Sequence, residues 1–226
     1  ITNRRDHMGV LQEAIDAYNA QKLAAVPTEI LETMSGATEA LKASGIESRA
    51  IRVDDQMPDF ELPNQHGELR RFSDYLKHSP VVLNVYRGGW CPYCNLEMKA
   101  LSEALPEIEA RGARLVGMAP ETPDKAMDTA ERHRIRIDIL SDAGNRVVER
   151  LGLVFELPEA LRPVYQGLGI DIPSYNGDDS FKLPVPATYI VAQDGVVAHA
   201  FVNADYTRRM EPAEIVARLD AVAAAA

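Results

Sequence analysis

The stretch VVLNVYRGGWCPYCNLEMK, residues 81 to 99, decides the fold. It begins with an apolar, β-branched run from Val81 to Val85, which is the pattern of a buried strand. The run breaks at Gly88 and Gly89, and after Pro92 the apolar positions recur at helical spacing. Proline is well tolerated in the first turn of a helix, because its missing N–H would have no partner there. The stretch therefore predicts a strand, a turn and a helix that begins near Pro92.

Two cysteines, Cys91 and Cys94, lie at the start of this predicted helix. Residues three apart share a helix face, so the two sulfur atoms can approach to disulfide distance. Unpaired N–H groups and the positive end of the helix dipole favour an anion there, which lowers the pKa of the first thiol. Since only the thiolate attacks a disulfide or a peroxide, Cys91 and Cys94 are predicted to form a redox-active pair.

A zinc site and a pair of buried structural thiols are the alternative interpretations of these cysteines. A structural zinc site of this type needs a second pair of ligands, but the chain has two cysteines and five scattered histidines. Buried structural thiols need apolar neighbours, whereas Trp90, Pro92 and Tyr93 indicate an exposed rim around the pair. We therefore expect no metal and no organic cofactor, and we expect these three residues to shape the site.

The composition of the chain limits its partners and compartment. The 226 residues carry a net charge of −10, and 46% of them are apolar, enough for one sizeable core. An acidic chain does not suit nucleic acid or an anionic membrane, since both attract basic surfaces. No apolar run is long enough to span a membrane, and no signal-peptide pattern is visible. Two cysteines placed for chemistry rather than crosslinking indicate a cytoplasmic protein.

The N-terminal part of the chain is predicted to form two helices within residues 7–45. Apolar residues recur at helical spacing on either side of Pro27-Thr28-Glu29, which is a helix-start signal, and Ser44-Gly45 is a stop signal. We define residues 1–50 as the N-terminal extension. It is interpreted as a cap that packs on the core, with a homodimer contact as the alternative.

The part of the chain after the redox helix alternates strands and helices. Predicted strands at residues 113–119 and 137–140 are joined by a helix, which implies a parallel sheet. Residues 187–201 form a predicted antiparallel hairpin. Before it, residues 155–184 hold several prolines and glycines and a polar loop. Long insertions of this kind are often functional, so the insertion is interpreted either as a lid over the cysteines or as packing on the sheet edge.

Trp90-Cys91-Pro92-Tyr93-Cys94, between a strand and a helix, resembles the redox site of the thioredoxin superfamily, with the Cys-Pro-Tyr-Cys core of glutaredoxins. Residues 58–74 resemble the first hairpin of peroxiredoxins of the AhpC/TSA type, and residues 184–197 resemble their late hairpin. The chain is most similar to a peroxiredoxin-like subgroup that carries the sequence of residues 87–95 and ends in a stretch like residues 205–212.

The resemblance covers roughly residues 50–220 and implies both a fold and an activity. The implied fold is an α/β thioredoxin fold in residues 51–226, with a mixed central sheet flanked by helices. The implied activity is reduction of hydroperoxides by the Cys91/Cys94 pair at the expense of a thiol donor, either thioredoxin or a glutathione-type thiol. The alternative is a dithiol-disulfide oxidoreductase that acts on protein or small-molecule disulfides and has little peroxidase activity.

Residue by residue, the chain departs from the peroxiredoxin pattern. Cys91 stands where that family carries a threonine, Cys94 where it carries the peroxidatic cysteine, and Pro186 near where it carries an arginine. Arg87 is the candidate for the missing cation. Pro186 instead resembles the cis-proline that faces the cysteine pair in thioredoxin-fold proteins, so a cis bond is expected there. Val85 stands where thioredoxins carry an acidic residue, so proton transfer to the resolving thiol needs another group.

Overall fold

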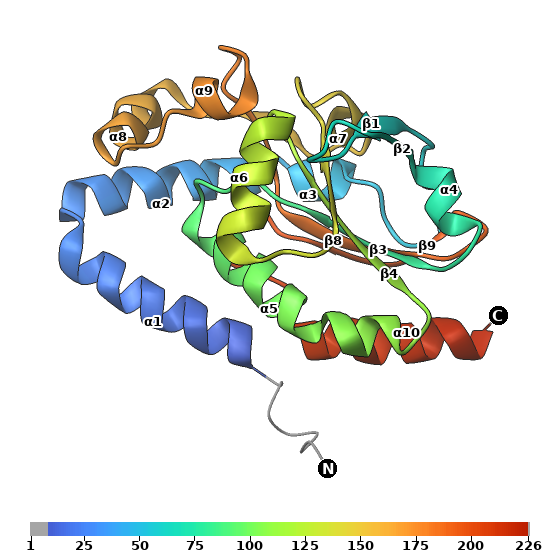
Figure 1. The fold of residues 1–226 in the computed structure, drawn as a ribbon. Coiled ribbons are helices and arrows are strands. Elements are labelled where there is room, and N and C mark those ends of the chain that lie inside the picture. The colour runs from blue at the N-terminus through green and yellow to red at the C-terminus, as the bar shows by residue number, and fades with distance from the viewer. Residues whose placement is uncertain (1–8, 226) are drawn as a thin grey trace.

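The computed structural model of the chain describes residues 9–225, which are built around a five-stranded sheet with strand order β5-β4-β3-β8-β9 (Figure 1). The strands are β3 (Val81–Val85), β4 (Arg114–Ala119), β5 (Asp138–Ser141), β8 (Ala187–Val191) and β9 (Val197–Val202). Strands β3, β4 and β5 are parallel, whereas β8 and β9 are each antiparallel to their neighbours. This is the mixed α/β sheet expected from the sequence.

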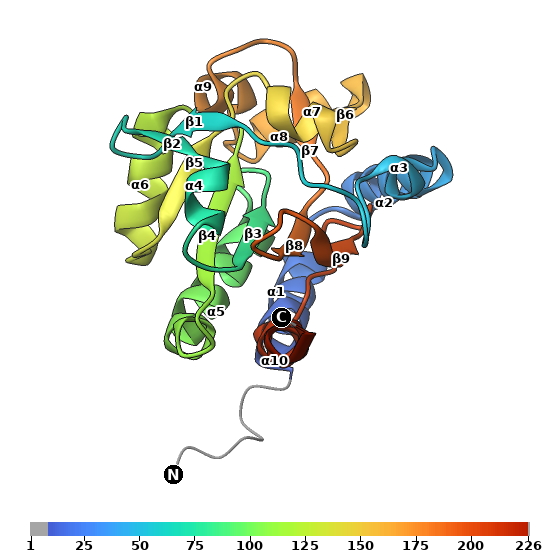
Figure 2. The ribbon, with the colours of Figure 1, turned by 90° about the vertical axis from the view of Figure 1, so that its right-hand side faces the viewer.

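Helices cover both faces of the sheet. Successive side chains of a strand point to opposite faces, so the apolar strand β3 presents apolar side chains on both of them. Val82 belongs to the hydrophobic cluster of one face and Leu83 to that of the other. The Val82 cluster includes residues of α5 (Pro92–Glu109), α6 (Pro123–His133) and α10 (Pro212–Ala225), and the Leu83 cluster includes residues of α4 (Phe72–Leu76) and α7 (Arg146–Arg150). Figure 2 shows α5 and α10 lying below the sheet. None of the helices in residues 9–225 is long and apolar enough to cross a bilayer.

The N-terminal extension forms the two predicted helices and a short third one. They are α1 (Val10–Ala25), α2 (Thr28–Ala43) and α3 (Ile46–Arg49). Residues 7 and 8, which the sequence placed in the first helix, lie outside the described residues. Leu11 and Ile15 of α1 are buried in the same hydrophobic cluster as α5, and the Glu211 carboxylate accepts hydrogen bonds from backbone N–H groups at the start of α1. The extension therefore packs on the core as a cap.

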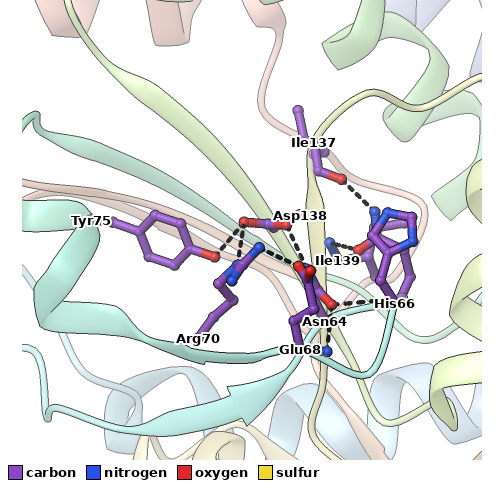
Figure 3. Close-up of polar contacts among 9 residues, drawn as sticks. Asn64, His66, Glu68, Arg70, Tyr75, Ile137, Asp138 and Ile139 are labelled. Carbon is purple, nitrogen blue, oxygen red and sulfur yellow. Dashed lines mark hydrogen bonds and ion pairs between the residues drawn. The ribbon is translucent and has the colours of Figure 1, made fainter.

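A hairpin of β1 (Glu61–Pro63) and β2 (Leu69–Arg71) is fastened to the edge strand β5. Asn64 Nδ2 donates to a carboxylate oxygen of Asp138 at 3.0 Å (Figure 3). The Gln65 side chain pairs with the β5 backbone: its Nε2 donates to Ile137 O at 3.0 Å, and its Oε1 accepts from Ile139 N at 2.8 Å. Since a side-chain amide occupies these edge groups, they are not free to pair with a strand of another chain.

The insertion at residues 155–184 folds into short elements. They are the 3-10 turn η1 (Glu159–Leu161), α8 (Arg162–Gly167), α9 (Ile172–Asn176) and β7 (Lys182–Pro184), which pairs with β6 (Val154–Glu156). Leu161 and Tyr165 are buried in a cluster that includes Met34 of α2, and Trp90 packs against the same cluster. The insertion and the N-terminal extension therefore meet beside the start of α5, the helix that carries the cysteines. This arrangement corresponds to the interpretation of the insertion as a lid.

Gly152, between α7 and β6, lies where no side chain fits, so a G152A substitution is expected to destabilise the protein. Its φ is +73°, and an added Cβ would overlap the backbone carbonyl of Arg49. Left-handed strain and overpacking together predict a loss of about 2–4 kcal/mol in the free energy of unfolding, measured by urea denaturation. Gly112 is the matched control, since its φ is +70° and its added Cβ meets nothing within 4 Å. G112A is expected to lose only about 1 kcal/mol, and equal losses would contradict the packing argument.

Candidate active site

Cys91 and Cys94 lie at the start of α5 as predicted. Cys91 is the N-cap of the helix, with φ −89° and ψ 115°, and Cys94 lies in its first turn. Both thiols are free, and they are 2% and 0% exposed. The expectation of an exposed rim is therefore wrong, because α1 and the insertion fold over the strand-turn-helix unit. Tyr93 is buried as well, with Tyr18 of α1 edge-on to its ring at 5.1 Å between centroids.

Cys91, and not Cys94, lines a cavity of about 230 Å³, which we call the Cys91 cavity. Its walls come from α1, the redox stretch, the insertion and the loop after β9. The polar and aromatic residues that line it are Tyr18, Lys22, Arg87, Trp90, Tyr93, Tyr165 and Tyr206. Across the described part of the chain, no group of three or more His, Cys, Asp or Glu side chains is placed to hold a metal ion.

Arg87 is buried beside this cavity and held there by three aromatic rings. Its guanidinium carbon lies 4.8 Å from the ring centroid of Trp90 and 4.5 Å from that of Tyr206. Its Nη2 donates a hydrogen bond to Tyr165 Oη at 2.7 Å. Because the cation has no carboxylate among these partners, its charge is left to act on the neighbouring thiol.

The pKa values of the two thiols are shifted in opposite directions. Burial alone would raise the pKa of Cys91, but the hydrogen bond from the Cys94 thiol and the charges of Arg87 and Arg209 lower the pKa of Cys91 well below its ordinary value. Burial raises the pKa of Cys94, and the hydrogen bond to Cys91 and the Cys91 charge raise it further. These opposite shifts favour Cys91 as the thiolate of the pair, in the direction that its position at the helix start predicts.

An R87M substitution is expected to raise the pKa of Cys91. Loss of an opposite charge close to a thiolate changes its pKa by about 1 unit or more, so the thiolate fraction near neutral pH falls. The ultraviolet absorbance of the thiolate, followed against pH, measures this change. R162M removes an arginine of the insertion that pairs with Glu156 at the surface and is the control. An unchanged titration in R87M would show that Arg87 does not stabilise the thiolate.

Cys94 faces a buried ion pair that no local pattern in the sequence indicates. Arg209 Nη2 lies 3.4 Å from the Cys94 sulfur, and Arg209 Nε lies 3.1 Å from Glu97 Oε2. The two side chains are 1% and 3% exposed. Burial raises the pKa of Glu97, and the charge of Arg209 opposes that rise. Arg209 belongs to the stretch 205–212 that resembles the peroxiredoxin-like subgroup. That resemblance was the only feature of the sequence that pointed to Arg209.

The Gly88-Gly89 turn is held against a second buried acid, Glu121. The Gly89 backbone N–H donates to Glu121 Oε1 at 2.8 Å, and a Cβ at Gly89 would overlap Thr129. Burial raises the pKa of Glu121 to about 7, although the hydrogen bond from Gly89 opposes the rise. No side chain fits at either glycine, because neighbouring side-chain atoms lie too close to the backbone there. The turn that carries Trp90 and Cys91 therefore has a defined position.

The peptide bond before Pro186 does not have the cis conformation that was expected, and Pro186 does not line the Cys91 cavity. Among the described residues no peptide bond is cis, so the bond that precedes Pro186 is trans. The Val185 N–H donates to Leu153 O at 2.8 Å, and the chain runs extended from β7 into β8. No tight turn therefore offsets the ordinary preference for trans. Pro186 lines a neighbouring apolar cavity of about 190 Å³ and is not among the residues that line the Cys91 cavity.

Comparison with known proteins identifies the family of the chain. Residues 53–200 match the model of the AhpC/TSA family. The chain is 26% identical over 103 residues to peroxiredoxin Bcp of Escherichia coli, which covers 46% of this chain and 65% of Bcp. It is 26% identical over 179 residues to 1-Cys peroxiredoxin A of Oryza sativa, covering 78% of this chain and 74% of that protein.

Solved structures show the same fold. The crystal structure of peroxidoxin BcpB from Mycobacterium tuberculosis superimposes with a TM-score of 0.60 at 24% identity, covering 76% of this chain and 97% of that one. The superposition supports the thioredoxin-type sheet, and the family model covers the strand, the turn and both cysteines. The chain therefore belongs to the AhpC/TSA family and is a peroxiredoxin-like protein of the thioredoxin superfamily.

Proposed function

We propose that the protein reduces hydroperoxides with Cys91 as the attacking thiolate and Cys94 as the resolving thiol. Its relatives are named peroxiredoxins, and the chain is an oxidoreductase of the thiol-dependent peroxidase kind. The observation that carries the assignment of roles is that Cys91 alone of the pair lines the cavity and has a lowered pKa. Cys94 is the thiol aligned with the peroxidatic cysteine of the family, so the roles are exchanged relative to that alignment.

The first step oxidises Cys91. Its thiolate attacks the terminal oxygen of the hydroperoxide, an S–O bond forms, and the O–O bond breaks. The leaving alkoxide takes up a proton and departs as an alcohol, and Cys91 becomes a sulfenic acid. The Arg87 guanidinium, fixed by Tyr165 and two aromatic rings, is placed to stabilise the negative charge that moves onto the peroxide oxygens.

The second step closes the disulfide. Cys94 loses its proton and attacks the Cys91 sulfur, the S–O bond breaks, and water is released. Arg209, 3.4 Å from the Cys94 sulfur, favours the thiolate that this step needs. An external dithiol or two thiols then reduce the disulfide and are oxidised to a disulfide themselves. Thioredoxin and a glutathione-type thiol are the two candidate donors, and a homodimer is the candidate assembly.

The alternative, a dithiol-disulfide oxidoreductase, has less support. It relied on a cis-proline opposite the cysteine pair, and the bond before Pro186 is trans. It also requires the reduced Cys91 to meet the sulfur of a disulfide substrate, whereas Cys91 with its thiol free is 2% exposed beneath α1 and the insertion. The peroxidase cycle requires such an approach only at the later step in which the donor reduces the Cys91–Cys94 disulfide. A small hydroperoxide fits the Cys91 cavity and needs no such exposure.

Turnover with each class of substrate separates the two functions. Reduced protein is supplied with hydrogen peroxide and with insulin disulfide in parallel, with thioredoxin and its reductase or with glutathione as the donor. The proposed function predicts donor oxidation that depends on peroxide and on both cysteines. Insulin reduction faster than by the donor system alone, lost in C91S and without peroxide turnover for either donor, would instead establish the alternative.

A further inference from the structure

Lys22 brings a second cation to the Cys91 cavity, and the thiol chemistry described above does not use it. Lys22 is on α1, outside the residues matched by the family model. It lines the cavity together with Arg87 and Cys91, and it is half-buried. Its Nζ lies 5.8 Å from the ring centroids of both Tyr93 and Tyr206, and 3.4 Å from Tyr206 Oη. The aromatic rings thus hold the ammonium group at the cavity wall.

The lining of the cavity holds two cationic side chains, Lys22 and Arg87, and one thiol that can be an anion, Cys91. None of the described residues that line it is acidic, so Lys22 and Arg87 face only the Cys91 thiolate. The acidic residue whose charge acts on Lys22 is Asp205. Asp205, however, accepts a hydrogen bond from Thr207 at 2.7 Å and lies 3.8 Å from Lys42. Lys22 is therefore available to an anionic group of a ligand, in a chain whose net charge is −10.

The remaining wall of the cavity suits a carbon skeleton. Val26, Met34, Leu168 and Ile170 supply apolar surface to the cavity that Lys22 and Cys91 also line. The volume of about 230 Å³ far exceeds what hydrogen peroxide needs, since an apolar protein cavity of about 150 Å³ is enough to bind benzene. A ligand with an apolar body and one acidic group matches this combination of surface and charge.

We propose that the Cys91 cavity selects organic hydroperoxides that carry a carboxylate on an apolar body, with Lys22 as the partner of the carboxylate. The inference rests on the proposed peroxidase function and names its substrate class. The peroxide group meets Cys91 beside Arg87, the carbon skeleton lies on the apolar wall, and the carboxylate lies at Lys22. The terminal oxygen passes to the Cys91 sulfur, and the remainder takes up a proton and leaves as a hydroxy acid.

Equilibrium binding tests the carboxylate site without any redox step. The probe is cumyl alcohol with a para-carboxylate, compared with its methyl ester, and binding is followed by Trp90 fluorescence or calorimetry. Wild type is expected to bind the acid about tenfold more tightly than the ester, a ratio that one partly buried charge pair provides. K22M is expected to lose this preference and K22R to keep it. K77M, which removes an exposed lysine paired with Asp74, is the control and is expected to match wild type.

Oxidation kinetics test the substrate class. The corresponding cumene hydroperoxide acid and its methyl ester are mixed with reduced protein in a stopped-flow instrument. The ratio of the two rate constants is compared within each variant, so that any change in Cys91 reactivity cancels. Wild type and K22R are expected to favour the acid about tenfold, and K22M to show a ratio near one. A ratio near one in wild type, or an unchanged ratio in K22M, overturns the proposal.

The two experiments separate failure of this proposal from failure of the peroxidase assignment. If acid binding depends on Lys22 but no hydroperoxide reacts faster than with a free thiol, the peroxidase function and this substrate class are both refuted, and the carboxylate site stands. If hydroperoxides react rapidly but acid and ester bind and react alike, the peroxidase function stands and the carboxylate site is refuted.

Discussion

A C91S substitution is expected to abolish rapid oxidation by hydrogen peroxide, with a loss of at least about a thousandfold in the rate constant, because Cys91 provides the low-pKa thiolate at the cavity. The C94S variant, in contrast, is expected to react once and stop at a Cys91 sulfenic acid, since no second thiol remains to form the disulfide. Stopped-flow kinetics measure the rate, and mass spectrometry after trapping with a sulfenic acid reagent locates the product.

The two single variants are matched controls for each other. Both replace a buried sulfur by oxygen in the same helix turn, so a general effect on folding alters both variants alike. The opposite pattern, fast oxidation in C91S and none in C94S, would assign the attack to Cys94 and its Arg209 contact. That outcome would restore the alignment with the peroxidatic cysteine of the family and refute the exchange of roles.

An R209M substitution is expected to destabilise the protein by about 3–5 kcal/mol, the cost of leaving one member of a buried ion pair without its partner. Arg209 and Glu97 are almost fully buried, and Arg209 also contacts the Cys94 sulfur. The free energy of unfolding from urea denaturation measures the loss. The R209M/E97Q double variant is expected to recover part of the stability, because the remaining side chain carries no charge.

The control for this substitution is R218M. Arg218 pairs with Glu214 at 3.3 Å on the surface of α10, and the two side chains are 52% and 44% exposed. Exposed pairs of this kind contribute about 0–1 kcal/mol. If R209M lost no more stability than R218M, the buried pair of Arg209 and Glu97 would have no structural role. The contact between Arg209 and Cys94 would then not depend on that pair.

The parts of the structure that follow from local sequence were predictable. The strand, the turn and the helix of residues 81–99 depend on neighbours within a few positions: β-branched residues, two glycines and a proline at the helix start. The parallel strands and the late hairpin follow from the alternation of apolar runs with helices and turns. The position of Cys91 at the N-cap follows from the same local pattern, and so does one cause of its lowered pKa, the charge of Arg87 four residues before it.

The parts that depend on distant segments were not predictable. Arg209 reaches Cys94 from 115 residues further along the chain, and no local pattern shows such a contact. The rim was expected to be exposed because Gly-Gly-Trp precedes the cysteines and Pro-Tyr separates them, but α1 and the insertion cover it. The expected cis bond before Pro186 rested on a short local motif. The backbone N–H of the preceding Val185 is hydrogen-bonded to Leu153, and a local motif does not show a contact with such a distant segment.

The central claim is that this buried dithiol is a peroxidase site, and the rate of its oxidation by hydrogen peroxide tests that claim most directly. Reduced protein is mixed with hydrogen peroxide in a stopped-flow instrument and followed by the fluorescence of Trp90, which stacks on Arg87 beside Cys91. We expect a rate constant at least about a thousandfold above that of a free thiol at the same pH, the scale that positioning and fixed charges supply. A rate constant equal to that of a free thiol would contradict it.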